Sequence, residues 1–160
     1  MLRPQRHDGN RVHVLRVSGI RPIRATELPA VCAVLRSADL PTDDIDGASP
    51  LQFWVTEANG GIAGVIGLER TGESALLRSL AVVPAQRHRR LGRELVAHVE
   101  VEARAAGFTE LALLTLTAQG YFEALGYATV ERARVPADVQ QTAQFRSLCP
   151  ASAVCMIKSL

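Results

Sequence analysis

The chain is poor in cysteine and in aromatic residues, and it has no long apolar run. Its three cysteines, Cys32, Cys149 and Cys155, form an odd set without the close spacing of a zinc site, so we expect reduced thiols and no bound metal. No run approaches the roughly 20 apolar residues that cross a membrane. No apolar segment typical of a secretion signal opens the chain. These features predict a cytoplasmic protein without a membrane partner.

A large surplus of one charge is also lacking. The formal net charge of +2 is too small to favour nucleic acid as a partner. The positive charge is concentrated at the start, where residues 1–24 hold six arginines against a single acid, Asp8. That stretch contains no interleaved aromatic residues, which nucleic-acid binding would favour. We expect residues 1–18 to be a disordered basic extension and residues 19–160 to form one domain.

Apolar patterning and turn signals predict a mixed α/β domain. A β-meander occupies the middle of the chain, because Asn59-Gly60-Gly61 and residues 71–74 are turn signals between apolar runs. A helical turn is expected within residues 136–150. The predicted strands are residues 20–23, 52–58, 62–70, 75–83, 111–117, 127–134 and 153–158, and the predicted helices are residues 26–38, 90–106 and 119–125.

The most informative stretch is the basic turn of residues 87–93, which lies between a buried strand and an amphipathic helix. Backbone N–H groups at a helix N-terminus attract an anion, and Arg87 and Arg89 can reach phosphates beside them. Cations at this end of a helix oppose its dipole unless an anion binds there. The turn therefore predicts a phosphate-binding site.

The pattern Arg87-x-x-Arg90-x-Gly92 resembles the acetyl-CoA pyrophosphate loop of the GNAT acetyltransferase superfamily, Arg/Gln-x-x-Gly-x-Gly/Ala. Arg90 replaces the first glycine, so its guanidinium either compensates for the lost close approach or the cofactor site is weakened. The segment from Tyr121 to Tyr127 resembles the family's late Phe-Tyr-Glu-x-Leu-Gly-Phe segment. These resemblances imply the GNAT fold over about residues 19–160: an α/β domain with a mixed central sheet of about six to seven strands and about four helices.

The resemblance also implies acetyl-CoA as the co-substrate and no metal ion. In this family the pantetheine arm of the cofactor pairs with the strand before the loop, which places it along the backbone of Leu80, Ala81 and Val82. The loop that would hold the phosphates comprises Arg87, His88, Arg89, Arg90, Leu91, Gly92 and Arg93.

Two finer resemblances concern the acceptor. Residues 79–82, 114–117 and 121–122 look like the acetyltransferase domain of N-acetylglutamate synthases, and the tail of residues 142–156 resembles a group of small arsenic-resistance N-acetyltransferases. They imply direct transfer of acetyl, without an acyl-enzyme, to the α-amine of a small amino acid or of a glutamate-analogue toxin such as arsinothricin or phosphinothricin. Dimers are common in the superfamily, so a homodimer is one option.

Arg78 is an unusual charge within its strand, and we expect Glu69 to lie opposite Leu76, diagonal to Arg78 on one face of the sheet. One interpretation is an internal salt bridge. The other is that Arg78 binds the acceptor's carboxylate while Glu69 accepts the amine proton. Ser79 and Thr115 fall where the synthase relatives carry small polar groups near the reacting atoms. Strand alternation predicts Ser79 on the face opposite Arg78, so only one of these two sets would line the acceptor pocket.

The general acid is a separate question. Many GNAT enzymes place a tyrosine at the position of Phe122, where it protonates the departing thiolate. Phe122 cannot do so. Tyr121, about 100° around the helix, replaces it unless the thiolate leaves unaided. Two other functions stay open: transfer to another amine, such as an antibiotic, a polyamine or a protein lysine, and non-catalytic sensing of an acyl-CoA.

Overall fold

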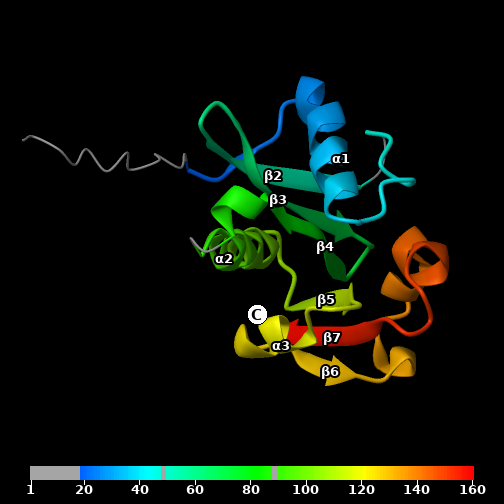
Figure 1. Cartoon of the computed structure of the whole chain (residues 1–160). Coiled ribbons are helices and arrows are strands. Elements are labelled where there is room, and N and C mark those ends of the chain that lie inside the picture. Colours follow the sequence, from blue (N-terminus) through cyan, green and yellow to red (C-terminus); the bar gives the residue numbers. More distant parts are fainter. Residues whose placement is uncertain (1–18, 48–49, 88–89) are drawn as a thin grey trace, which may run out of the picture.

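The computed structural model describes residues 19–47, 50–87 and 90–160 (Figure 1). The predicted extension of residues 1–18 lies outside the described residues, as do His88 and Arg89 of the predicted phosphate loop. The described residues form a seven-stranded sheet with helical segments packed on both of its faces.

The sheet has the order β1-β2-β3-β4-β5-β7-β6. β4 and β5 run parallel, and the other neighbouring pairs are antiparallel. The expected mixed sheet of six to seven strands is therefore confirmed. The strands are β1 (Arg21–Pro22), β2 (Leu51–Ala58), β3 (Gly61–Arg70), β4 (Ala75–Val82), β5 (Glu110–Thr115), β6 (Ala128–Val130) and β7 (Val154–Ser159).

Helical segments cover the two faces of the sheet differently. α2 (Leu91–Ala105) and α3 (Gln119–Ala124) lie on one face, where their apolar side chains pack with those of β2 to β5. α1 (Leu28–Ser37) lies on the other face, so that α1 and α2 flank the strands from opposite sides (Figure 1). Residues 135–149, which include the π-helical turn η5 (Gln144–Leu148), share the face of α1. None of the described helices is long and apolar enough to cross a membrane.

Most predicted elements differ from the structure by a residue or two at their ends, and in two of them a predicted end is a 3₁₀ turn instead. The helix expected at residues 26–38 begins as a 3₁₀ turn (Ala25–Glu27), and α1 starts only at Leu28, with Pro29 in its first turn. The strand expected at residues 127–134 ends at Val130. A second 3₁₀ turn follows it, in which the Arg132 guanidinium donates to the Ala153 carbonyl at 3.3 Å, so this segment leaves the sheet edge.

Candidate active site

β4 carries an irregularity at the centre of the sheet. Gly67 pairs with Arg78 and Val65 pairs with Ala81, so the single residue Ile66 faces two residues of β4. This is a β-bulge, and one of its residues, Ser79, has a φ of 57°. A left-handed conformation is costly for a residue other than glycine. The bulge shifts the alternation of the strand, so the prediction that Arg78 and Ser79 belong to separate sets on opposite faces is wrong.

β4 also separates from β5 just before the bulge. The two strands pair only at Ala75 with Leu111 and at Leu76 with Ala112. Beyond these pairs a cleft of about 550 Å³ opens between them. Its walls include residues 77–82 of β4, residues 113–118 at the end of β5, and side chains from both faces of the sheet. The predicted site residues Arg78, Ser79, Leu80, Ala81, Val82, Arg87, Thr115 and Tyr121 all line this cleft.

On the α2 face, the cleft meets the start of α2. Arg90 precedes the helix with a φ of 59°, the conformation that the family's glycine would adopt without strain, and its side chain makes no capping hydrogen bond. The first backbone N–H groups of α2 therefore have the geometry of an anion site. Arg87 and Arg93 are exposed beside this turn, and the Arg87 side chain donates to the Val82 carbonyl at 3.2 Å. The Leu91 side chain is buried.

Tyr121 reaches from α3 to this same turn. Its hydroxyl lies so close to Gly92 that a Cβ added there would be 2.6 Å from the Tyr121 oxygen. Burial raises the pKa of the Tyr121 hydroxyl, and the nearby Arg93 guanidinium partly opposes the rise. The Tyr121 ring packs edge-on against Phe122, which is buried in the core. An alanine at position 92 would therefore require the Tyr121 hydroxyl to shift.

On the α1 face, a buried ion cluster adjoins the cleft. The side chain of Arg78 is 1% exposed, and both of its terminal nitrogens donate to the Asp44 carboxylate, one at 2.8 Å. Arg78 also donates to Glu69 at 3.2 Å and to the Ser79 hydroxyl at 3.3 Å. The expected register of Glu69 opposite Leu76, and the internal salt bridge, are confirmed. Arg78 lines the cleft, whereas Glu69 does not line it and contacts Arg78 instead.

Burial in this cluster affects the ionisation of Glu69. Removal from water raises the pKa of the Glu69 carboxyl, and the charge and hydrogen bond of Arg78 oppose the rise.

Thr115 lies across the cleft from Arg78. Its hydroxyl accepts a hydrogen bond from the Ala118 N–H at 3.0 Å, which fixes the turn after β5.

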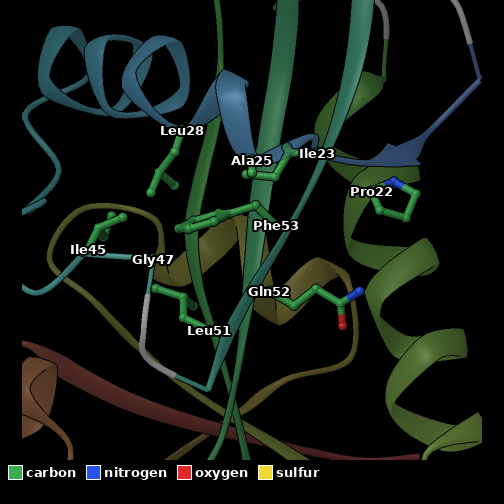
Figure 2. Close-up of a pocket in the computed structure, with 9 residues that line it drawn as sticks. All are labelled: Pro22, Ile23, Ala25, Leu28, Ile45, Gly47, Leu51, Gln52 and Phe53. Carbon is green, nitrogen blue, oxygen red and sulfur yellow. The ribbon is translucent and has the colours of Figure 1, made fainter.

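A second cavity, of about 270 Å³, lies between α1 and β2 (Figure 2). Its described walls carry no charged side chain and are formed mainly by apolar ones such as Leu28, Ile45 and Phe53. Among the described residues that line it, Gln52 has the one polar side chain, and its amide points away from Leu28 and Ile45 in Figure 2. The described residues that line this cavity offer none of the groups that acyl transfer needs, so the cleft between β4 and β5 is the candidate reaction site.

Comparison with known proteins decides the family. Residues 49–129 match the acetyltransferase (GNAT) domain. The chain belongs to the GNAT acetyltransferase family. An uncharacterised N-acetyltransferase of Chlorobaculum tepidum is 30% identical to this GNAT protein over 113 residues, which cover 68% of this chain and 70% of the relative. The expected GNAT N-acetyltransferase is thus confirmed.

Solved structures support the same fold. N-acetylglutamate synthase from Neisseria gonorrhoeae, complexed with coenzyme A and N-acetyl-glutamate, matches with a TM-score of 0.77 at 19% identity, over 91% of this chain and 35% of the synthase. A GNAT acetyltransferase from Staphylococcus aureus matches with a TM-score of 0.71 at 18% identity, over 91% of this chain and 99% of its own. This GNAT domain therefore spans about a third of the synthase.

Sequence reasoning missed two residues of this GNAT site. Asp44 could not be predicted, because nothing local shows that a carboxylate 34 positions away pairs with Arg78. Gln144 is buried and lines the cleft. The resemblance of residues 142–156 to one acetyltransferase group was the available signal for it. Within the described residues, no group of three or more metal-ligating side chains comes together.

Proposed function

We propose that this protein transfers the acetyl group of acetyl-CoA directly to the α-amine of a small amino acid. One observation carries the proposal: the cleft between β4 and β5 has an anion-binding helix start on one face of the sheet and a buried guanidinium, that of Arg78, on the other. A phosphate-bearing acyl donor and a carboxylate-bearing acceptor can therefore meet between the strands.

The donor would enter from the α2 face. Its phosphates would bind the N–H groups at the start of α2, together with the loop arginines, of which Arg87 and Arg93 are exposed. Beyond Leu76, β4 has no β5 partner, so the backbone of Leu80, Ala81 and Val82 would pair with the amides of the pantetheine arm, in place of the Arg87 side chain that binds the Val82 carbonyl. A backbone N–H near the bulge would then face the oxygen that gains negative charge during the attack.

The acceptor would bind from the α1 face. The forked hydrogen bonds of Arg78 to the Asp44 carboxylate have the geometry with which a guanidinium binds any carboxylate, including that of an amino acid. We propose that the acceptor's carboxylate replaces Asp44, which lies on the connection between α1 and β2 and is the more exposed of the two acids. Glu69 would then accept the amine proton, directly or through water.

The chemistry balances within these groups. The neutral amine nitrogen attacks the thioester carbon, a C–N bond forms, the C–S bond breaks, and the thiolate leaves and takes up a proton. Ser79 and Thr115 would hold the reacting groups by their hydroxyls. The Tyr121 hydroxyl would donate that proton, although burial raises its pKa and so makes it a weaker acid than an exposed tyrosine.

Among amino acids, we propose glutamate and its toxic analogues, of the arsinothricin or phosphinothricin kind, as the acceptor class. The support is the tail of residues 142–156, which contributes to the wall of the cleft, and the fold shared with N-acetylglutamate synthase.

The test is mass spectrometry of the purified protein with acetyl-CoA and a panel of arsinothricin, phosphinothricin, glutamate, spermidine and an aminoglycoside. Acetylated glutamate analogues are expected. Acetylation of spermidine or the aminoglycoside alone would replace the amino-acid proposal by another amine. Bound acetyl-CoA with no product from any acceptor would favour a sensor.

A further inference from the structure

Gln144 has an unusual environment for a polar side chain. It is 6% exposed and lines the cleft between β4 and β5. Its side-chain oxygen is buried and has no hydrogen-bond partner among residues 19–47, 50–87 and 90–160. A buried carbonyl oxygen without a donor is costly, so such groups are rare unless they serve a ligand.

The backbone around Gln144 is held firmly, so the side chain is presented from a fixed position. Gln144 opens the π-helical turn η5, and its carbonyl accepts from the Cys149 N–H at 2.9 Å. Just before it, the Thr142 hydroxyl donates to the Val139 carbonyl at 2.7 Å. Just after it, the Arg132 guanidinium lies 4.4 Å from the centre of the Phe145 ring. π-helical turns occur frequently at functional sites.

The position of η5 shows on which face of the sheet Gln144 enters the cleft. Phe145 and Cys149 pack in the cluster that contains Leu76 and Leu114, on the face of the sheet opposite α2. Arg78 and its ion cluster share this face, whereas the helix start that suits the donor's phosphates lies on the other. In Figure 1 the orange segment that carries η5 also lies away from α2. Gln144 therefore belongs to the acceptor end of the cleft.

We propose that the side-chain oxygen of Gln144 accepts a hydrogen bond from the amine of the acceptor while Arg78 binds the acceptor's carboxylate. This inference rests on the proposed function and narrows it. An amide oxygen that lacks a donor within the chain selects a ligand that brings an N–H group. The Gln144 oxygen is buried, so the terminal amide must rotate to bring it to the ligand; this last torsion of a glutamine is broad, and no backbone movement is needed. Together the two side chains recognise an α-amino acid by its amine and its carboxylate.

Steady-state kinetics of Gln144→Leu, with the acceptor that the wild type acetylates, test the proposal. The acceptor KM is expected to rise about tenfold or more, because a hydrogen bond to an amine is lost, and the acetyl-CoA KM is expected to stay unchanged. Gln144→Glu keeps the size and an accepting oxygen, so it should restore the acceptor KM. Gln141→Leu is the matched control, since Gln141 is exposed on the same segment and does not line the cleft. An unchanged acceptor KM in Gln144→Leu, or an equal rise in both KM values, would overturn the proposal.

A binding measurement separates this inference from the proposed function. Calorimetry of glutamate and phosphinothricin, with CoA present, does not depend on turnover. Weaker binding to Gln144→Leu than to the wild type supports the role of Gln144 even if no product forms. Equal binding to both overturns that role even if the wild type acetylates the acceptor, and no binding to the wild type overturns both.

Discussion

Replacement of Arg78 by methionine should destabilise the protein strongly. The substitution keeps most of the side-chain volume but leaves Asp44 and Glu69 without their shared cation. These carboxylates are 19% and 10% exposed, and the Arg78 side chain is 1% exposed. Removal of one partner from a buried ion pair costs about 3–5 kcal/mol, because an uncompensated charge stays behind. In a domain of this size each kcal/mol shifts Tm by about 2–4 °C, so a fall of roughly 6–20 °C is expected.

The assay is thermal and urea unfolding followed by circular dichroism. The control is the triple variant Arg78→Met, Asp44→Asn, Glu69→Gln. It also removes the two negative charges that the single variant leaves without a cation. It should regain at least half of the lost stability, because uncharged groups avoid most of the desolvation cost. If Arg78→Met does not fold, Arg78→Lys supplies the measurement. Lysine keeps the positive charge but cannot form the bidentate hydrogen bonds that Arg78 makes to Asp44. A loss below about 1 kcal/mol, the range of exposed pairs, would refute the reasoning, as would a triple variant no more stable than the single one.

Three other substitutions test single features of the site. Arg90→Gly should raise the free energy of unfolding in urea by roughly 1 kcal/mol, because the left-handed conformation of Arg90 costs about 1–2 kcal/mol and the added flexibility of the unfolded chain offsets only about 0.4–1 kcal/mol; a loss of stability would contradict this. Gly92→Ala forces the partly exposed Tyr121 side chain to shift, which costs roughly 0.5–1.5 kcal/mol if the ring leaves its rotamer and offsets the helix-propensity gain of about 1 kcal/mol that alanine brings to α2; that gain should appear in full in a Tyr121→Ala background, as a double-mutant cycle would measure. Burial raises the pKa of Glu69 above 4.5, so above pH 4.5 the native state keeps a proton that the unfolded chain loses, and stability falls as pH rises through the folded pKa. Glu69→Gln should remove this dependence of the unfolding free energy on pH, whose slope is at most about 1.4 kcal/mol per pH unit. The measurement is urea unfolding from pH 4.5 to 7, and an unchanged slope would show that another group causes the dependence.

The order of elements could be predicted because their signals are local. Asn59 and Gly60 both have positive φ, as the turn between two apolar runs requires, and Gly107 ends α2 with a φ of 93°. The strand before the phosphate loop was also predictable from its composition. The bulge in that strand was not predictable, because it contains no glycine. It depends on how β4 pairs with β3 while it separates from β5.

The same limit applies to the site. Glu69 could be assigned to Arg78 because a short hairpin connects their strands, which fixes the register. Asp44 lies on a connection whose path depends on how α1 packs, so its pairing with Arg78 is a tertiary property. Gln144 follows the same rule, since only the folded chain shows that its oxygen lacks a donor.

Backbone strain marks the active cleft independently of any motif. Four non-glycine residues with positive φ occur in the part of the chain that the structure describes: Asp39, Asn59, Ser79 and Arg90. Asp39 follows α1 and Asn59 lies in a hairpin, where these residue types tolerate the left-handed region. Serine and arginine do not share this tolerance, so residue type does not explain the positive φ of Ser79 and Arg90. One forms the bulge where β4 has left β5, and the other begins the helix whose N–H groups face the donor's expected phosphates. Strain of about 1–3 kcal/mol at each persists only where the surrounding structure enforces it. Ser79 lines the cleft and Arg90 begins the helix beside it, so the two strained positions that residue type does not explain both lie at the candidate site.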